Sequence, residues 1–502
     1  MKKYAREQIR NLALVSHGGA GKTSLVESLL FKTGGSSRRG KIEEGNTVAD
    51  YDPEEIKRKI TISTSIVPCE WKNHKLNLLD TPGFFDFEGE VKEALRVAES
   101  ALVIVRGTSG VEVGTEKVWE YAQDLPKMVF VNKMDRENAD FSKVLSALQG
   151  MFGPSVVAVQ LPIGKEADLS GIVDLVSMKA YKLDGGKRTE IPIPDELAAE
   201  AETLREQLLE AVAVTDEDLM ERYLGGETIE ASEIAQAVAV GVKQKDVVPV
   251  LCGSASLGVG MEELLDALAA YCPSPLDRDP EIGTKPGGDG EVECIADANR
   301  SLAALVFKTT ADPFVGKLTF FRVFSGTLRS DSQVLNVSRK TDERIGQLFI
   351  QKGKEQVPTD AIVAGDIGAV AKLAATVTGD TIADKGTPVV LPGIDFPHPV
   401  LTMAMEPKAK GDEDKIASGL SRLLEEDPTI KMERRAETRQ LLVSGMGELH
   451  LEIMASRLQK KFGVEVELTD PKVPYRETIR GKTKVEGKHK KQSGGRGQFG
   501  HV

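Results

Sequence analysis

The feature that most constrains the fold is a glycine-rich segment between an apolar run and a helical stretch. Leu12–Val15 has the apolar, β-branched character of a buried strand, and Ser16-His17-Gly18-Gly19-Ala20-Gly21-Lys22-Thr23 follows it directly. Such a loop directs backbone N–H groups and the N-terminus of the next helix toward bound phosphate. A glycine-rich turn without a ligand is the alternative. The pattern predicts an α/β domain with a phosphate-binding loop.

Four further apolar runs of strand length have the same character. They are Leu76–Leu79, Ala101–Val105, Met128–Val131 and Val247–Leu251. Amphipathic stretches separate them, which predicts a doubly wound parallel sheet with ligand-binding loops after the strands. More than a hundred residues separate Asp135 from the last of these strands. We therefore expect an inserted subdomain at about residues 159–245, carrying acidic helices such as Asp195–Val214.

The remainder of the 502-residue chain is too long to share one core with this domain. A loop rich in Pro and Gly ends the first domain, which we place at residues 1–283. Short strand-like runs separated by Gly-Asp and Ser-Asp turns predict a β-barrel at 284–399. A strand-helix-strand-strand-helix-strand order then predicts a ferredoxin-like α+β domain at 400–475, with Leu449, Ile453, Met454 and Leu458 on the buried side of its second helix.

Charge is distributed unevenly along the chain, whose formal net charge is −12. Residues 190–233 hold fourteen acidic and two basic side chains, whereas residues 476–502 hold eight basic and two acidic ones. The first segment predicts an acidic helical face and the second a basic arm. The apolar runs are too short to span a bilayer, and the four cysteines are scattered. We expect a cytoplasmic monomer with no membrane partner.

The side chains of the phosphate loop predict specific roles. Lys22 would reach the β- and γ-phosphates, and the Thr23 hydroxyl would bind Mg²⁺. The other residues of the loop, from Ser16 to Gly21, and Ser24 would line the nucleotide. Ser16 occupies the place of the usual first glycine. At the end of a second strand, Asp80-Thr81-Pro82-Gly83 offers a carboxylate for Mg²⁺ and the Gly83 amide for the γ-phosphate.

The residues at two further strand ends predict which nucleotide base is bound. In Asn132-Lys133-Met134-Asp135 the carboxylate of Asp135 accepts hydrogen bonds from guanine N1–H and its exocyclic amine, an edge that adenine lacks. Asn132 would tie loops together, and the Lys133 stem would cover the base. After the last strand, the backbone of Ser254 and Ala255 could donate to guanine O6. Four motifs in this order predict a GTP site rather than an ATP site.

With these motifs the chain resembles the translational GTPases, and elongation factor G most closely. Five further segments carry the resemblance: Gln160–Gly164, Gly171–Leu175, Asp312–Leu318, Ser444–Glu452 and Gln492–Gly500. The resemblance implies a ribosome-bound GTPase that moves tRNA and mRNA, an inserted subdomain that touches the ribosomal stalk protein, and a fourth domain that enters the decoding site. Residues 476–502 would then be the truncated start of that domain, and its basic side chains would contact RNA phosphate.

Several positions depart from the family pattern. Phe84 stands where the family has a histidine that orients the attacking water, and its ring has no hydrogen-bonding atom. Gly18 and Gly19 replace a gate residue and a cation ligand. Thr61 is retained in the first switch and would sense Mg²⁺ and the γ-phosphate. We therefore expect a divergent paralogue with Lys22, Thr61 and Gly83 as its catalytic groups, Thr23 and Thr61 as metal ligands, and weakened hydrolysis.

Alternatives remain open at this point. The chain could be a ribosome-protection or release-type member, a recycling factor, or a GTP-sensing switch that barely hydrolyses. Two histidines that invite a chemical role have simpler interpretations. We expect His17 to pack beside the loop rather than act as a base. We also expect His450 to be a satisfied surface or interface histidine, because no second metal ligand is spaced to join it.

Overall fold

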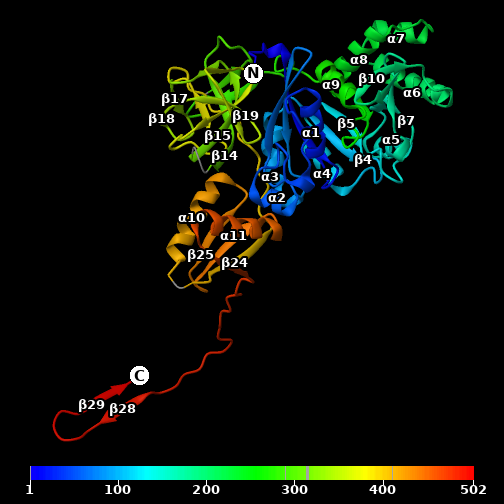
Figure 1. Cartoon of the computed structure of the whole chain (residues 1–502). Coiled ribbons are helices and arrows are strands. Elements are labelled where there is room, and N and C mark those ends of the chain that lie inside the picture. The colour runs from blue at the N-terminus through cyan, green and yellow to red at the C-terminus, as the bar shows by residue number, and fades with distance from the viewer. Residues whose placement is uncertain (1, 289, 313–315, 410) are drawn as a thin grey trace.

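The computed structural model describes residues 2–288, 290–312, 316–409 and 411–502. An α/β domain with an inserted subdomain comes first, followed by a β-rich domain and a small α+β domain (Figure 1). The C-terminal segment then leads away from the rest of the molecule. The multidomain α/β class predicted from the sequence is confirmed.

The first domain is built on a seven-stranded sheet of order β2-β3-β1-β4-β5-β11-β6. Its strands are β1 (Ile9–Ser16), β2 (Ser65–Trp71), β3 (His74–Asp80), β4 (Ser100–Arg106), β5 (Lys127–Asn132), β6 (Val156–Ala158) and β11 (Val248–Cys252). Its helices are α1 (Lys22–Lys32), α2 (Pro53–Arg58), α3 (Glu88–Val97), α4 (Val113–Tyr121), α5 (Phe141–Phe152) and α9 (Met261–Tyr271). All five predicted strands are present and pair in parallel, whereas the unpredicted β2 pairs antiparallel with β3.

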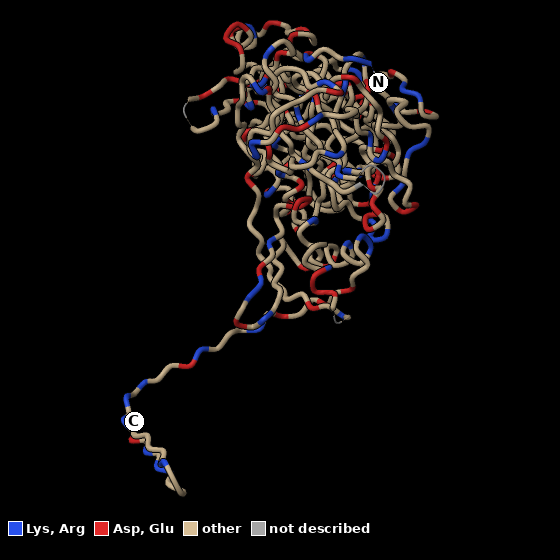
Figure 2. Tube along the Cα trace, turned by 90° about the vertical axis from the view of Figure 1, so that its left-hand side faces the viewer, with Lys and Arg blue, Asp and Glu red and all other residues tan. Residues whose placement is uncertain are grey.

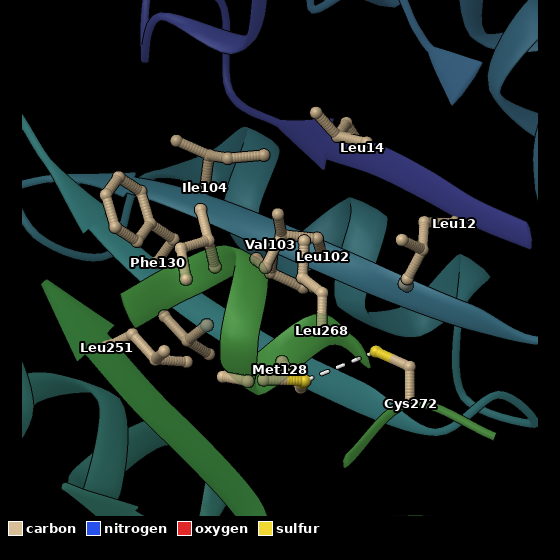
Figure 3. Close-up of a cluster of buried hydrophobic side chains, with 14 of the residues drawn as sticks. Leu12, Leu14, Leu102, Val103, Ile104, Met128, Phe130, Leu251, Leu268 and Cys272 are labelled. Atoms are coloured by element: carbon tan, nitrogen blue, oxygen red, sulfur yellow. Dashed lines mark hydrogen bonds between the residues drawn. The ribbon is translucent and has the colours of Figure 1, made fainter. Parts of the chain in front are cut away.

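The central strands are buried on both faces because helices cover both sides of the sheet. Figure 3 shows side chains of β1, β4, β5 and β11 around Leu268 of α9. The Cys272 thiol is hydrogen-bonded to Met128 Sδ at 3.4 Å. This is why the sequence of each strand is an apolar run rather than an alternating pattern. The rigid sheet fixes the loops at its carboxyl edge, where the predicted site residues lie.

The inserted part contains a second, four-stranded antiparallel sheet of order β10-β9-β8-β7. Its strands are β7 (Gln160–Ile163), β8 (Gly171–Asp174), β9 (Lys179–Asp184) and β10 (Lys187–Ile191). The helices α6 (Asp195–Ala213), α7 (Glu217–Leu224) and α8 (Ala231–Gln244) follow. Figure 1 places this subdomain on the opposite side of the first domain from the β-rich domain.

The β-rich domain contains an eight-stranded antiparallel sheet of order β18-β17-β23-β14-β15-β22-β19-β20. Its strands are β14 (Ala303–Asp312), β15 (Gly316–Ser325), β17 (Gln333–Asn336), β18 (Thr341–Arg344), β19 (Leu348–Lys352), β20 (Glu355–Thr359), β22 (Ile367–Ala371) and β23 (Thr381–Ala383). Two short pairs accompany it: β12 (Glu281–Thr284) with β13 (Glu291–Cys294), and β16 (Thr327–Arg329) with β21 (Ala361–Val363). Residues 313–315 of the barrel motif lie outside the described residues.

Buried polar contacts join the first two domains. Lys75 of β3 lies 2.7 Å from the carboxylate of Asp366, and both residues are buried. Arg322 of β15 pairs with Glu99 and also donates to the carbonyl of Val97 at 2.7 Å. Removing one partner of a buried ion pair leaves an uncompensated charge. These contacts therefore fix the orientation of the β-rich domain relative to the sheet.

The third domain has the predicted ferredoxin-like order and a four-stranded sheet of order β25-β26-β24-β27. Its elements are β24 (Leu401–Pro407), α10 (Glu413–Glu426), β25 (Lys431–Arg435), β26 (Gln440–Gly445), α11 (Glu448–Phe462) and β27 (Val466–Thr469). The predicted buried side of α11 is divided between two cores. Met454 and Leu458 pack inside the domain, whereas Leu449 and Ile453 pack against Ile60, Ile62 and Phe87 of the first domain.

The C-terminal segment extends away from the third domain and ends in a hairpin of β28 (Lys488–Lys491) and β29 (Gln498–His501) (Figure 1). Its side chains are exposed, and blue lysines and arginines recur along it in Figure 2. No helix in the described part of the chain is both long and apolar enough to cross a membrane.

Candidate nucleotide-binding site

The predicted site residues converge at the carboxyl edge of the parallel sheet. The phosphate loop leaves β1 and ends where α1 begins at Lys22. Gly21 has φ +95°, and a β-carbon there would lie 2.7 Å from Asn132 Nδ2, so only glycine fits. Ser16, in the place of the first glycine, accepts a 2.7 Å hydrogen bond from Lys22 Nζ. The hydroxyl therefore positions the lysine from within the loop.

The last residue of β5 and the residue after it supply two side chains that hold the loop in place. Asn132 Nδ2 donates to the carbonyl of Ala20 at 3.0 Å, and Lys133 Nζ donates to the carbonyl of Gly19 at 2.8 Å. Met134 is buried, and its N–H donates to the Gly253 carbonyl at 3.2 Å. These bonds place the β5 and β11 loops beside the phosphate loop.

The end of the site that is predicted to select the base is formed by Asp135 and two serines. Ser254 Oγ donates to one carboxylate oxygen at 2.7 Å, and Ser256 Oγ donates to the other at 3.0 Å. The N–H of Ala255 donates to Asn132 Oδ1 at 3.1 Å in this structure. Each carboxylate oxygen can still accept a second hydrogen bond. The orientation of Asp135 is therefore fixed before any base arrives, and Ser256 is a contributor that the sequence motifs did not indicate.

The expected metal side of the site brings together four oxygen-bearing side chains. Thr23 Oγ1 and Thr61 Oγ1 are 3.0 Å apart, although the residues are far apart in sequence. Asp80 is fully buried and Asp50 is 4% exposed, and none of their carboxylate oxygens has a hydrogen-bond partner among the described residues. Buried unpaired carboxylates are costly. Two carboxylates and two hydroxyls are hard oxygen donors that fit Mg²⁺.

The electrostatics of this cluster follow from its burial. Burial raises the pKa of Asp80 to about 8, and repulsion from Asp50 adds to the effect. Burial likewise raises the pKa of Asp50 to about 6, and repulsion from Glu27 adds to the effect. Burial lowers the pKa of Lys22 to about 8, although Asp80 and Asp50 oppose that change. A divalent cation at this place would favour the charged carboxylates.

Asp50 is a second candidate site residue that the sequence motifs did not indicate. It lies outside every recognised motif, eleven positions before Thr61. Its proximity to Asp80 depends on how residues 50–63, here called the switch segment, approach the start of α1, where Thr61 meets Thr23. Glu55 holds that fold by accepting hydrogen bonds from the N–H groups of Ile62 and Ser63, each at 3.0 Å.

The segment after β3 approaches the phosphate loop closely. Thr81 Oγ1 donates to the Leu14 carbonyl at 2.6 Å and fixes the turn that Pro82 continues. A β-carbon on Gly83 would lie only 2.8 Å from Lys22 Nζ. Phe84 is 43% exposed, and its ring lies 3.8 Å from a β-carbon placed on Gly18. The ring thus stands at the rim of the site and offers no hydrogen bond.

The two histidines singled out from the sequence have structural partners. His17 Nδ1 accepts from the N–H of Gly114 at 3.3 Å beside the loop. His450 is buried, and its Nε2 lies 2.8 Å from the Asp427 carboxylate while Nδ1 accepts from the Met446 N–H. Both rings are occupied by local hydrogen bonds.

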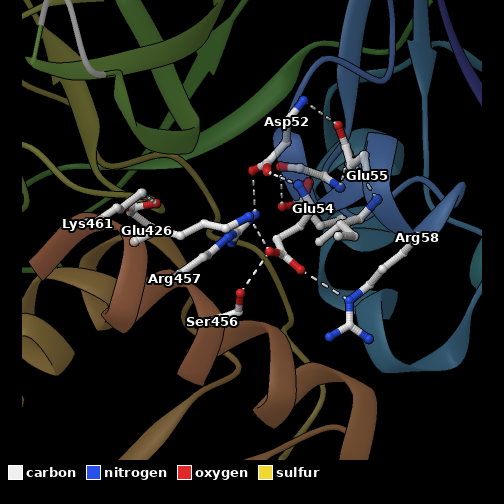
Figure 4. A network of polar contacts seen from close by, with 12 residues as sticks. Asp52, Glu54, Glu55, Arg58, Glu426, Ser456, Arg457 and Lys461 are labelled. Carbon is white, nitrogen blue, oxygen red and sulfur yellow. Dashed lines mark hydrogen bonds and ion pairs between the residues drawn. The ribbon is translucent and has the colours of Figure 1, made fainter. Parts of the chain in front are cut away.

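The switch segment also contacts the third domain (Figure 4). Glu54 is 1% exposed and accepts hydrogen bonds from Ser456 Oγ at 2.7 Å and Lys460 Nζ at 2.5 Å. Asp52 Oδ2 lies 3.3 Å from Arg457 Nη2. The switch segment therefore makes two sets of contacts. Asp50 and Thr61 lie at the expected metal side, and Asp52 and Glu54 contact α11.

Comparisons with known proteins agree with this architecture. Residues 7–274 match the elongation factor Tu GTP binding domain, residues 301–385 elongation factor G domain 2, residues 396–470 domain III and residues 471–502 domain IV. A crystal structure of a protein from Thermus thermophilus matches with a TM-score of 0.86 and 37% identity, over 99% of this chain and 72% of that one. This chain therefore belongs to the elongation factor G-like translational GTPases.

Proposed function

We propose that the protein binds GTP with Mg²⁺, hydrolyses it slowly, and acts on the ribosome in translocation or a related step. The observation that carries the proposal is the cluster of Thr23, Thr61, Asp50 and Asp80 beside Lys22. Because four oxygen donors and one buried ammonium meet at the end of a glycine-rich loop, the site favours a metal-bound polyphosphate. Asp135, fixed by two serines, favours guanine.

The position of each side chain indicates its role in binding and hydrolysis. Lys22 Nζ lies close to Gly83 and would stabilise the charge of the terminal phosphate. Thr23, Thr61, Asp50 and Asp80 would hold Mg²⁺, directly or through water, and the ion would neutralise charge developing on the phosphates. Phe84 takes the place of a water-positioning group and can donate or accept nothing. The site therefore has the groups needed to bind GTP but lacks one that would speed its hydrolysis.

Through the switch segment, the position of the third domain would depend on which nucleotide is bound. Thr61 and Asp50 lie at the metal side, and Glu54 lies against Ser456 and Lys460 of α11. Any change that moves Thr61 must also strain or break these contacts, because only a few residues separate them. The domain arrangement would thus respond to whether GTP orders the segment.

Ribosome contact is proposed from family membership together with charge. Domain IV residues 471–502 carry exposed basic side chains suited to RNA phosphate. The acidic helices α6 and α7 would meet the stalk protein. A second candidate is a GTP-dependent switch or protection factor that barely hydrolyses, which Phe84 specifically favours. The GTPase domain would end at residue 283, the β-barrel at residue 399 and the ferredoxin-like domain at residue 475.

Two measurements test the proposal. Titration with fluorescent GDP and ATP analogues in Mg²⁺ should show binding of the guanine nucleotide alone. Equal binding of both would refute the guanine assignment. Single-turnover GTP hydrolysis with and without ribosomes then separates the candidates. Stimulation by ribosomes supports an elongation-type GTPase, whereas ribosome binding without stimulation supports the switch.

A further inference from the structure

Arg106 is a charged residue beside the phosphate loop that none of the motifs includes. It ends β4, between the strands β1 and β5 that carry the loop and Asn132. In the sheet it stands in register with Asn132. Its position at the carboxyl edge is therefore the position of a ligand-binding side chain.

The guanidinium of Arg106 is held in a defined orientation. Nε and Nη2 donate to the two carboxylate oxygens of Glu112, at 3.0 and 2.5 Å, and Glu112 itself caps α4. A two-point pair of this kind fixes the plane of the group. Nη1 makes no hydrogen bond with any residue that the structure describes. Arg106 Nη1 is therefore held in place and remains able to donate a hydrogen bond to a ligand.

The available nitrogen faces the phosphate loop at a residue without a side chain. A β-carbon built on Gly19 would meet only one atom within 4 Å, Arg106 Nη1 at 4.0 Å. Lys133 Nζ also approaches this residue and donates to the Gly19 carbonyl at 2.8 Å. Gly19 has φ +77°, so its backbone is folded as a loop that can approach a ligand closely. Two cationic side chains thus approach the same loop residue, and the space that a side chain of its own would fill is open.

We infer that Arg106, oriented by Glu112, is an additional phosphate-binding residue that contacts the polyphosphate of the bound nucleotide across the open face of Gly19. The inference rests on the proposed function, because it assumes that guanine nucleotide occupies this loop. An arginine suits the task because it stays charged and donates from a rigid plane. Arg106 would add one charge-assisted contact to those of Lys22 and the backbone amides.

The test compares nucleotides that differ only in phosphate. Arg106→Gln should weaken GDP binding about tenfold, the effect of losing one charge-assisted hydrogen bond. Its affinity should also depend less steeply on salt than that of the parent protein. Competition by guanosine, which has no phosphate, should be unchanged. Arg106→Lys should restore part of the GDP affinity, and Glu112→Gln should cause an intermediate loss by releasing the guanidinium.

The controls distinguish an error in the role given to Arg106 from an error in the proposed function. Arg329→Gln, at an exposed position at the end of β16, should leave binding unchanged. If folded Arg106→Gln binds GDP as the parent does, Arg106 makes no phosphate contact. If it loses GDP and guanosine affinity equally, Arg106 only supports the loop, and the inference is wrong. If the parent protein itself binds no guanine nucleotide, the proposed function fails before Arg106 is tested.

Discussion

The contact between Glu54 and helix α11 gives a prediction whose size follows from the structure. Glu54→Gln keeps the shape of the side chain and an acceptor for Ser456, but it removes the charge that Lys460 and Arg58 face. The Arg58 pair lies within one helix and contributes only about 0.2–0.5 kcal/mol. The carboxylate is 1% exposed, so the Lys460 contact is worth more, and the change should cost about 2 kcal/mol in total.

Hydrogen–deuterium exchange measures this cost locally, which suits a protein whose domains need not unfold together. A loss of about 2 kcal/mol should speed exchange of amides in the switch segment and in α11 about 30-fold. Glu452→Gln is the matched control, because Glu452 also pairs with Arg58 but is about half exposed. That variant should change exchange less than about threefold. Equal exchange in Glu54→Gln and the parent would refute the coupling.

The pH dependence provides an independent check on Glu54. Burial raises the pKa of this carboxyl, but hydrogen bonds from Lys460, Ser456 and Arg58 outweigh burial and lower the pKa to about 2. Because the folded pKa lies below the ordinary value of 4.5, the stabilisation is complete above pH 4.5 and is lost as the pH falls toward 2. The parent protein should lose exchange protection over this window, and Glu54→Gln should lose less.

Three further predictions concern the nucleotide. Asp135→Asn should weaken GDP binding about 10- to 100-fold and shift preference toward xanthine nucleotides in competition assays; unchanged GDP affinity would contradict the base assignment. Asp50→Asn should raise the Mg²⁺ concentration that half-maximally slows GDP dissociation about tenfold, because one oxygen ligand charge is lost; identical Mg²⁺ dependence would exclude Asp50 from the metal site. Phe84→His should speed single-turnover GTP hydrolysis on ribosomes at least about tenfold. A neutral effect in a protein that already hydrolyses rapidly would show that another group orients the water.

Local sequence determined the framework of this protein. The five parallel strands were visible because strands buried on both faces must be apolar along their whole length. The ferredoxin-like domain was visible in the order of its helices and strands. The phosphate loop and the guanine motif were readable because each consists of neighbouring residues at a strand end. By contrast, β2 and β6 carry weak signals: β2 lies at an edge, and β6 is only three residues long.

Tertiary structure alone decided which distant charges meet. Asp50 lies near Asp80, Glu54 contacts α11, and Arg106 faces Gly19, yet no spacing in the sequence indicates these contacts. Even the buried side of α11 was divided, with Leu449 and Ile453 turned to the first domain. The physical reason is that periodicity records that a side chain is buried, but not which surface buries it. A charged side chain leaves no periodic signal at all, because its partner is supplied by a different part of the fold.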